Sequence, residues 1–253
     1  MKIYCVTHKP LPVLRNDLYV PIQVNCNVNS KIDKSILQDN TQDNISSKND
    51  NFCELTATYW LLKNTNTLDI IGLCHYRRYF NFYPNPLSFK PSCQKKISVS
   101  KLLKHKITTL SIEKQRAKIA NDLKTYDIIL PKPRKMQLSI TEDYITNHRE
   151  SDWVKTKEII MVKYPDFEKS ITQYLDNNTK FYQCNMMITS KKIWDDYHTW
   201  LFDILFELEK KVVIPEDNFQ KRIFGFISER LLNLYFLHHN FKIKEYPLLF
   251  LKD

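Results

Sequence analysis

Short apolar runs and longer periodic segments alternate along this chain, and this pattern predicts strands and helices in turn. The runs that favour strands lie at residues 2–7, 21–24, 69–74, 127–130 and 182–189. The run DIIGLC at 69–74 is apolar almost throughout, which is typical of a central strand covered on both faces. The polar segment 25–51 predicts a long loop, a kind of segment that often carries function.

Apolar residues at helical spacing predict a helix that begins after Asn51 and further helices over 98–124, 141–163, 191–211 and about 216–239. In the first of these, Asn51 and Glu54 have the spacing of a capping box. Apolar and aromatic residues from Ile193 to Leu208 recur at helical spacing, which predicts a face buried in the core. Because strands alternate with helices, we expect an α/β fold: a single Rossmann-type domain over residues 1–253, with a mainly parallel sheet flanked by helices.

The low glycine content limits the ways in which this chain can bind a phosphorylated ligand. The chain has 253 residues, 43% of them hydrophobic, and two glycines, where average usage predicts roughly 18. Gly72 and Gly225 are isolated, which excludes the G-x-G-x-x-G dinucleotide loop and the G-x-x-x-x-G-K-[ST] phosphate loop. Side chains or helix N-termini must therefore hold the phosphates of any phosphorylated ligand.

The cysteine pattern and the N-terminus bear on the cellular compartment. Six cysteines are present and none has C-x-x-C spacing, which disfavours a zinc ribbon or a redox dithiol. The N-terminal MKIYCVTHKP lacks the apolar core of a signal peptide, and no stretch of 18 apolar residues occurs. We therefore expect a cytoplasmic protein with reduced thiols.

The net charge of +10 is concentrated in one segment. Residues 90–135 contain 13 Lys and Arg but only 3 Asp and Glu, and they overlap a basic, partly helical insertion expected at about 84–125. A solvated basic face explains such a segment, and so does contact with nucleic acid, an anionic membrane surface or lipid-linked phosphates. Tyr126 is the one aromatic residue there, so a platform for stacking nucleic-acid bases is missing.

In an open α/β sheet, ligands bind beyond the carboxyl ends of the strands. The residues that this rule singles out are Thr7, His8, His75, Tyr76, Arg77, Arg78, Asn185 and Met186. Two adjacent arginines at the exit of a buried strand are costly unless they are paired or face a ligand. The arginine fork matches phosphate oxygens, and the alternative is that one arginine pairs with a carboxylate such as Glu54.

Two other groups of polar residues are candidates for chemistry. Glu216 and Asp217 precede the last predicted helix, where helix capping explains their carboxylates and where a general base would also be well placed. His148 and Asp152 are four residues apart and share a predicted helix face. A third ligand is missing for them, so they are weak support for a metal site.

Several segments resemble a bacterial family classed for a long time as a domain of unknown function. The segments that carry the resemblance are VTHKP (6–10), DNTQDNIS (39–46), NFCELTATYW (51–60), DIIGLCHYRRYF (69–80), DIILP (127–131) and FGFISERLLN (224–233). Members of that family occur among capsule, exopolysaccharide and lipopolysaccharide biosynthesis proteins and are taken to be glycosyltransferases, some of them galactofuranosyltransferases. The resemblance implies a GT-A-like fold and an inverting transfer of a sugar, such as galactofuranose, from a UDP-sugar.

The order of elements is also similar to that of GT-A glycosyltransferases, in which an Asp-x-Asp tripeptide holds a divalent metal against the donor diphosphate. The equivalent tripeptide here is His75-Tyr76-Arg77. Arginine cannot bind Mg²⁺, whose ligands are oxygens. This departure from the Asp-x-Asp pattern leads us to expect an enzyme that needs no metal cofactor, in which Arg77 and Arg78 neutralise the diphosphate leaving group; dependence on Mn²⁺ or Mg²⁺ is the alternative.

The resemblance further implies roles for individual residues. Asp217, with Glu216 as the second candidate, is expected to be the catalytic base that deprotonates the acceptor hydroxyl. The residues expected to bind the nucleotide donor are Thr7, His8, Asp43, Asn44, Ser46, Asn49, His75, Tyr76, Arg77 and Arg78. The residues expected on the sugar or acceptor side are Tyr144, His148, Asp152, Asn185 and Met186.

The expected partners are a UDP-sugar donor and a glycan or lipid-pyrophosphate-linked acceptor. The basic segment is expected to hold the enzyme peripherally at the anionic inner membrane surface, and nucleic acid is not expected as a partner. Two alternatives stay open. The first is a nucleic-acid-binding protein that uses residues 90–135, and the second is a transferase that moves a sugar phosphate and releases a nucleoside monophosphate.

Overall fold

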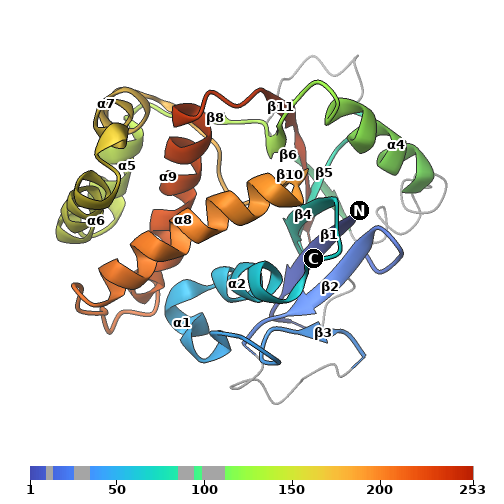
Figure 1. The fold of residues 1–253 in the computed structure, drawn as a ribbon, viewed down its shortest axis with the longest axis horizontal. Helices are drawn as coiled ribbons and strands as arrows, with labels where there is room; N and C mark the ends of the chain where they lie inside the picture. The colour runs from blue at the N-terminus through green and yellow to red at the C-terminus, as the bar shows by residue number, and fades with distance from the viewer. Residues whose placement is uncertain (10–13, 26–34, 85–93, 99–111, 253) are drawn as a thin grey trace.

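A large, mainly parallel sheet forms the centre of the molecule (Figure 1). This computed structural model describes residues 1–9, 14–25, 35–84, 94–98 and 112–252. The strands along the main path of the sheet are β1 (Lys2–Thr7), β2 (Tyr19–Gln23), β3 (Leu37–Gln38), β4 (Ile70–His75), β7 (Ile128–Pro131), β10 (Met187–Ser190) and β11 (Ile243–Tyr246). Their order across the sheet is β11-β7-β10-β4-β1-β2-β3, which places β4 and β1 near the middle.

Most neighbouring strands run in the same direction. β1 pairs in parallel with β2 and β4, β2 with β3, and β7 with β11, whereas β10 is antiparallel to β4 and β7. The remaining strands of the sheet are β5 (Arg78–Phe80), β6 (Gln94–Ser98) and β12 (Leu248–Lys252). β5 is antiparallel to β4 and β12, and β6 is parallel to β12. The predicted α/β fold with a mainly parallel sheet is confirmed.

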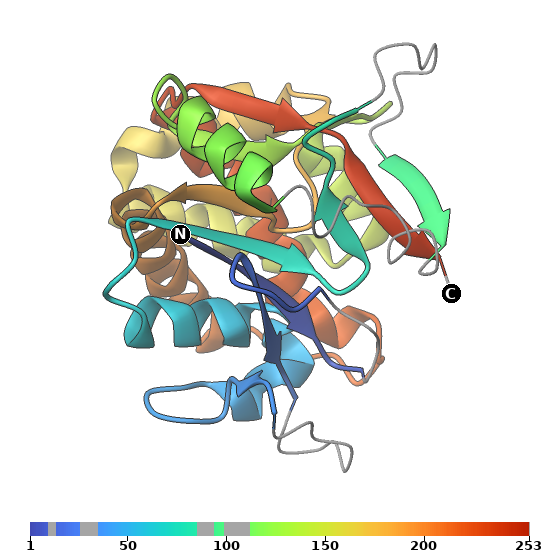
Figure 2. The same cartoon turned by 90° about the vertical axis from the view of Figure 1, so that its right-hand side faces the viewer.

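Helices cover both faces of this sheet. The longer helices are α2 (Leu55–Asn64), α4 (Ile112–Asp122), α5 (Ile140–Asn147), α6 (Glu150–Lys163), α8 (Lys191–Glu209) and α9 (Ile223–His238). The short helical segments are η1 (Ser46–Lys48), α1 (Asn49–Phe52), η2 (Pro165–Phe167), α7 (Glu168–Ile171), η3 (Thr172–Asp176) and η4 (Gln220–Arg222), and a separate ladder joins β8 (Arg134–Lys135) to β9 (Lys180–Phe181). In Figure 2, α4 lies in front of the sheet and α8 and α9 lie behind it.

Strand residues alternate between two hydrophobic clusters, one on each face of the sheet. Tyr4 and Val6 of β1 pack into the cluster that contains α8 and α9, while Ile3 and Cys5 pack into the cluster that contains Ile119 of α4. A sheet buried on both faces requires strands that are apolar at successive positions, which explains the DIIGLC run. The predicted core stripe of α8 is confirmed, because Trp194, Tyr197, Trp200, Leu201, Ile204, Leu205 and Leu208 are buried.

Gly72 of β4 is needed for the close approach of β10. A Cβ atom at this position would lie 2.8 Å from Cγ1 of Ile188 and 3.2 Å from the carbonyl oxygen of Met187. Contacts this short between carbon atoms are repulsive. Glycine at position 72 therefore permits the antiparallel pairing that places β10 beside the central strand.

Two predicted elements are interrupted by residues in the left-handed region. The helix predicted after Asn51 is broken at Cys53, whose φ is 52°, so the chain forms α1 and then α2, and the expected capping box is wrong. Asn51 instead donates its amide to the carbonyl of Lys221 at 3.0 Å. The strand predicted at 182–189 shrinks to β10, because Cys184 and Asn185 have φ values of 77° and 47°.

Three predicted helices have different bounds. The helix predicted at 141–163 is two helices, α5 and α6, because His148 takes an extended conformation and Ser139 and Glu142 form a capping box that starts α5. The helix predicted at 216–239 begins at Ile223 as α9. Of the helix predicted at 98–124, residue 98 belongs to β6, residues 99–111 lie outside the described part of the chain, and α4 accounts for the remainder.

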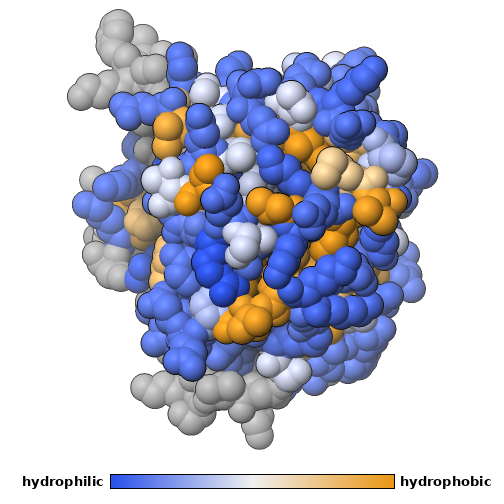
Figure 3. All heavy atoms as spheres, turned by 90° about the vertical axis from the view of Figure 1, so that its left-hand side faces the viewer, coloured by the Kyte–Doolittle hydropathy of each residue, from blue (hydrophilic) through white to orange (hydrophobic). Residues whose placement is uncertain are grey.

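The face that carries α6 and α7 shows hydrophobic residues in patches separated by polar ones (Figure 3). On α6, Val154, Met161 and Val162 are exposed. Exposed apolar side chains that polar neighbours separate are ordinary on protein surfaces. They do not identify a partner for this face.

Candidate functional site

A cavity of about 560 Å³ lies beyond the carboxyl ends of β1, β2 and β4. The residues that line it are Val6, His8, Val24, Asn25, Asn49, Asp50, Cys53, Glu54, His75, Tyr76, Arg78, Cys184, Asn218, Lys221, Arg222 and Glu229. The end of a parallel sheet is the usual place for a ligand, and the volume is in the range of small-molecule sites. The cavity is therefore the candidate functional site.

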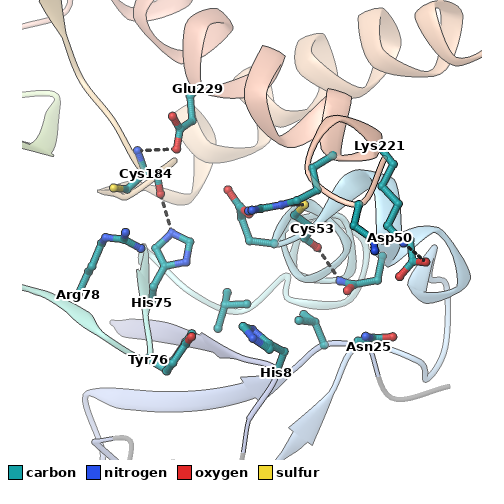
Figure 4. Close-up of a pocket in the computed structure, with 16 residues that line it drawn as sticks. His8, Asn25, Asp50, Cys53, His75, Tyr76, Arg78, Cys184, Lys221 and Glu229 are labelled. Atoms are coloured by element: carbon teal, nitrogen blue, oxygen red, sulfur yellow. Dashed lines mark hydrogen bonds and ion pairs between the residues drawn. The ribbon is translucent and has the colours of Figure 1, made fainter. Parts of the chain in front are cut away.

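Three sides of this cavity can be followed in Figure 4. In that view, Glu229, Cys184, His75 and Arg78 lie along one wall, and Cys53, Asp50 and Lys221 lie along the opposite wall. Tyr76, His8 and Asn25 lie at the base, where the strands end. The side chains thus come from strand ends, from the α1–α2 turn, and from η4 and α9.

The first wall is built around the left-handed pair Cys184 and Asn185. Nε2 of His75 and the carbonyl oxygen of Cys184 are 2.6 Å apart, and the backbone N–H of Cys184 donates to Oε1 of Glu229 at 3.0 Å. The amide of Asn185 donates to Oε1 of Glu54 and to Oγ of Ser228, both at 2.8 Å. Side chains from β4, the start of α2 and α9 therefore hold this turn in place.

The hydrogen bond of His75 also fixes its tautomer. A carbonyl oxygen only accepts, so Nε2 of His75 must carry the proton. Burial lowers the pKa of His75, with Arg78 acting in the same direction and Glu54 and the Cys184 carbonyl opposing it. The ring is therefore neutral at pH 7, and Nδ1 remains able to accept a hydrogen bond.

The opposite wall depends on a second left-handed residue, Cys53. The amide of Asn49 donates to the carbonyl of Cys53 at 2.7 Å and to Oγ1 of Thr56 at 3.0 Å, which stabilises the turn between α1 and α2. Nε of Arg222 donates to Sγ of Cys53 at 3.2 Å, and its guanidinium packs on the ring of Phe226. Arg222, although exposed, is thereby held at the edge of the cavity.

The cavity carries more positive charge than the strand-end rule alone predicts. Lys221 forms an ion pair of 3.0 Å with Asp50, and the guanidinium of Arg78 lies over the ring of Phe250. The pKa of His8 is lowered by burial and then by Lys9 and Arg222, among other cations. Burial is the largest cause, and the contribution of the cations shows that an anion would be stabilised here.

The pKa values of one carboxyl group and two thiols in the cavity are also shifted. Burial raises the pKa of Glu229, and the nearby Glu54 adds to this effect. Burial raises the pKa of Cys53 to about 11 and that of Cys184 to about 12. Both thiols therefore stay protonated at neutral pH, and neither has the thiolate character of a nucleophile.

The structure brings five of the predicted donor-binding residues to this cavity. These residues are His8, Asn49, His75, Tyr76 and Arg78. Thr7 lies just below it, buried, with its hydroxyl donating to the carbonyl of Lys9 at 2.8 Å. Arg77 does not line the cavity and packs its guanidinium against the ring of Tyr76.

Three predicted residues of the polar loop support the loop itself. Oδ1 of Asp43 accepts from the hydroxyl of Tyr59, and the amide of Asn44 donates to the carbonyl of Gln42. The hydroxyl of Ser46 donates to Oδ1 of the buried Asp39 at 2.7 Å. These side chains do not line the cavity.

The residues predicted on the acceptor side lie in two places. Asn185 is buried beside Glu54, as described above, and Met186 is buried in the cluster that packs against α4. A separate group at α5 and α6 contains Tyr144, His148 and Asp152. Tyr144 stacks on Trp153, and Asp152 pairs with Arg149. His148 stacks on Phe226 and contacts Gln220, so it touches the η4 segment but not the cavity.

The predicted base and its neighbour lie at the start of η4. Oδ1 of Asp217 accepts from the backbone N–H groups of Phe219 at 2.9 Å and Gln220 at 2.7 Å, which is a capping arrangement. Neither Glu216 nor Asp217 lines the cavity, whereas the next residue, Asn218, does. Catalysis by Asp217 stays a prediction.

Sequence reasoning did not select Lys221, Arg222 and Glu229. Glu229 lies within the segment FGFISERLLN (224–233), and Lys221 and Arg222 lie just before it. The family resemblance therefore included this region but gave these three residues no role. Glu54 was considered only as a helix cap and as a partner for arginine. A sequence signal for Glu229 was present: it is a charged residue in the N-terminal half of α9, a helix that is otherwise almost wholly buried.

The described residues of the basic segment are partly engaged within the protein. Arg116 of α4 donates to the carbonyl of Met1 at 3.2 Å, and Lys118 pairs with Asp122 at 2.7 Å. Four of the 13 Lys and Arg of residues 90–135 fall in the ranges 85–93 and 99–111, outside the described part of the chain. Membrane contact by this segment stays a prediction.

The described residues bear on membrane insertion and on metal binding. No helix in this part of the chain combines the length and the apolar character needed to cross a bilayer. Within the same residues, no three His, Cys, Asp or Glu side chains converge on a point where they could hold a metal ion. The position after β4 offers His75, Tyr76 and an arginine, a donor set that does not fit a Mg²⁺ or Mn²⁺ site of the Asp-x-Asp kind.

Comparison with known proteins extends these observations. The family described as Domain of unknown function (DUF4422) matches residues 2–240. Among solved structures, the chain is similar to the apo structure of the WbbM bifunctional glycosyltransferase, with a TM-score of 0.85 and 28% sequence identity. The similarity covers 100% of this chain and 45% of that chain, so this chain spans less than half the length of WbbM. No curated protein matches the sequence.

Proposed function

This chain belongs to the DUF4422 family, and from that premise we propose that it is a glycosyltransferase acting on a nucleotide-sugar donor. The observation that carries the proposal is the cavity of about 560 Å³ at the carboxyl ends of β1, β2 and β4, in a fold shared with a glycosyltransferase. Its charged lining suits a ligand that has both phosphate and sugar groups, because cations bind phosphates and carboxylates bind hydroxyl groups.

The donor diphosphate is assigned to the cations of the cavity. Lys221 lies on one wall, where Arg222 is hydrogen-bonded to Cys53, and Arg78 faces them from the other wall. Positive charge fixed in place before the reaction stabilises the negative charge that develops on a leaving diphosphate. In this proposal, arginine and lysine do the work that a metal ion does elsewhere, so transfer does not require Mg²⁺ or Mn²⁺.

The finer identity of the substrates follows from the family resemblance. We assign UDP as the nucleotide and galactofuranose as the first donor sugar to test. The acceptor is assigned to a lipid-linked or free oligosaccharide of a surface polysaccharide. Peripheral attachment to an anionic membrane through the basic segment belongs to the same proposal, since acceptors of this kind are held at a membrane.

The test is thermal-shift binding of UDP, UDP-galactofuranose and UDP-galactopyranose, in EDTA and again with Mn²⁺. A ligand present at 100 times its Kd stabilises the folded state by about 2.7 kcal/mol, which a melting curve resolves. Stabilisation by UDP in EDTA is the expected result. Stabilisation that appears only with Mn²⁺ would contradict the cation assignment, and the absence of a shift with every nucleotide would contradict the transferase.

The product of the reaction separates this proposal from transfer of a sugar phosphate. A glycosyltransferase releases UDP, whereas a sugar-phosphate transferase releases UMP. Chromatography of the nucleotide product after incubation with donor and acceptor therefore decides between the two reactions.

A further inference from the structure

Three carboxyl groups line the cavity, and their partners differ. Asp50 is paired with Lys221 at 3.0 Å. Glu54 accepts the amide of Asn185 at 2.8 Å and is close enough to Arg222 to raise the pKa of that guanidinium. Glu229 has one oxygen, Oε1, on the backbone N–H of Cys184, and its other oxygen is 3.7 Å from Nη1 of Arg230, beyond hydrogen-bond distance.

The cation that forms an ion pair with Glu229, Arg230, is also engaged elsewhere. Arg230 donates from Nη2 to Oδ2 of Asp143 at 2.8 Å and from Nη1 to the carbonyl of Phe226 at 3.1 Å. The guanidinium of Arg230 also lies over the ring of Phe181, and neither residue lines the cavity. Glu229 is therefore oriented through Cys184 and interacts electrostatically with Arg78, Arg222 and Arg230, but no cation among the described residues donates a hydrogen bond to it.

The surroundings of Glu229 favour proton uptake. Burial raises its pKa and Glu54 acts in the same direction, while Arg230, the N–H of Cys184 and Arg78 act against them. The side chain is 24% exposed and lines the cavity, so a substrate can reach it. A carboxylate with a raised pKa takes a proton more readily than an ordinary one, which suits a general base near neutral pH.

Asp217 has the opposite surroundings. Its Oδ1 accepts two backbone N–H groups, and the residue is exposed at the start of η4. It also lies outside the cavity lining, so a substrate in the cavity does not meet it.

We propose that Glu229 is the catalytic base that removes the proton from the acceptor hydroxyl. The hydroxyl oxygen attacks the anomeric carbon of the donor sugar and a new glycosidic bond forms. The bond from that carbon to the diphosphate oxygen breaks, the electron pair leaves with the nucleoside diphosphate, and the proton of the hydroxyl passes to Glu229.

The position of Glu229 fits the geometry of such a displacement. Lys221 is on the wall opposite Glu229 in Figure 4, and Arg222 is bonded to Cys53 of that same opposite wall. In this proposal the diphosphate lies against these two cations, with Arg78 of the Glu229 wall at its sugar end, so that it leaves from the side of the sugar that faces away from Glu229. Attack and departure on opposite sides of the anomeric carbon invert its configuration, so the inference predicts an inverting enzyme.

This inference rests on the proposed function and is tested with Glu229→Gln in the full chain. Glutamine has the same size, and its Oε1 still accepts the N–H of Cys184, but it cannot take up the proton. Transfer is measured as UDP released from UDP-galactofuranose and from UDP-galactopyranose, with octyl β-galactoside as acceptor. The affinity for UDP and the melting temperature are measured on the same samples, and Glu158→Gln on the exposed surface of α6 is the control.

A fall of about 100-fold or more in kcat for Glu229→Gln, with Kd for UDP within about twofold of the wild type, supports the inference. A smaller fall overturns it, and a large fall in Asp217→Asn with an active Glu229→Gln would assign the base to Asp217. Asn caps a helix as well as Asp does, so Asp217→Asn does not disturb the start of η4. If the wild-type chain itself releases no UDP from either donor, the proposed glycosyltransferase function fails, and this inference fails with it.

A second variant distinguishes a catalytic role of Glu229 from a merely structural one. Glu229→Asp keeps the carboxylate but withdraws it by about one methylene, so it should retain more activity than Glu229→Gln if proton transfer is the function. If both variants lose the same activity together with UDP affinity and melting temperature, Glu229 supports the Cys184 turn and is not the base.

Discussion

Nε2 of His75 donates to the carbonyl oxygen of Cys184 at 2.6 Å, which ties the end of β4 to the left-handed turn before β10. These residues are far apart in sequence but both line the cavity. The hydrogen bond therefore couples the shape of one cavity wall to the register of the central strands.

Removing this hydrogen bond should destabilise the fold and loosen the cavity. In His75→Ala, the Cys184 carbonyl loses its donor in a buried setting, which costs about 1–3 kcal/mol. Urea unfolding of the variant should show a lower free energy of unfolding. His75→Gln offers a new amide donor and should recover part of the loss; equal losses in the two variants would show that the hydrogen bond itself contributes little.

The two adjacent arginines should differ in importance. Arg78 lines the cavity and Arg77 does not, so Arg78→Ala should weaken UDP binding about tenfold or more, while Arg77→Ala should change it by less than about threefold. Isothermal titration of UDP measures both affinities. Equal losses in the two variants would restore the sequence-based expectation that both arginines hold the diphosphate.

Arg222 should contribute more to donor affinity than its neighbour Lys221. The guanidinium is held by Cys53 and Phe226, whereas Lys221 is already paired with Asp50. A charge-assisted hydrogen bond contributes about 1.5–3 kcal/mol, so Arg222→Ala should raise the Kd for UDP by about 10- to 150-fold. Arg222→Lys keeps the charge without the fork and should be intermediate. An unchanged Kd in Arg222→Ala would contradict the assignment of the diphosphate to this wall.

Gly72→Ala should destabilise the protein by about 1–3 kcal/mol, because the added methyl would lie 2.8 Å from Cγ1 of Ile188. Thermal or urea unfolding measures the loss. The double variant with Ile188→Ala should lose less than the two single losses combined, since the second change removes the clash. Simple addition of the two losses would indicate that the strands move apart without strain.

Acid should destabilise the fold through His198. Burial lowers the pKa of this residue to about 3, while its ring is hydrogen-bonded to the carbonyl of Trp194 at 2.8 Å. Below pH 6.5 the unfolded chain takes up a proton that the folded chain refuses, so stability present at pH 7 is lost progressively toward pH 3. Between pH 7 and pH 5 the loss is about 2 kcal/mol.

The variant His198→Asn tests this pH dependence. Asparagine keeps a side-chain donor for the Trp194 carbonyl but does not titrate. The difference in unfolding free energy between wild type and variant should therefore change by about 2 kcal/mol between pH 7 and pH 5. A difference that is constant with pH would mean that His198 does not contribute to the acid sensitivity.

The elements with a clear period were predictable, and the failures have a common cause. The apolar run of β4 and the stripe of α8 follow directly from burial on both faces of a sheet and on one face of a helix. Cys53 and Cys184 broke a predicted helix and a predicted strand, because both adopt the left-handed region. Cysteine carries no sequence signal for that conformation, and tertiary contacts impose it here.

The candidate site was predictable where strands end and not where helices pack. His8, His75, Tyr76 and Arg78 follow from the rule that ligands bind beyond parallel strands. Arg78 is the cross-strand partner of His75, so the two side chains share a face of the hairpin, whereas Arg77 lies in the turn between β4 and β5 and does not line the cavity. Glu229 and Arg222 reach it because α9 packs against the sheet in one orientation, a relationship that the period of α9 does not contain.

The left-handed residues have a consequence for how this protein can change. Six described residues other than glycine have positive φ, and Asn25, Cys53 and Cys184 among them line the cavity. A side chain in that conformation costs about 1–2 kcal/mol that glycine would avoid. Cys53→Gly and Cys184→Gly are therefore routes to a more heat-resistant protein, but each would soften a wall that strain now holds rigid. A lineage selected for thermal tolerance and one selected for turnover would diverge first at these two positions.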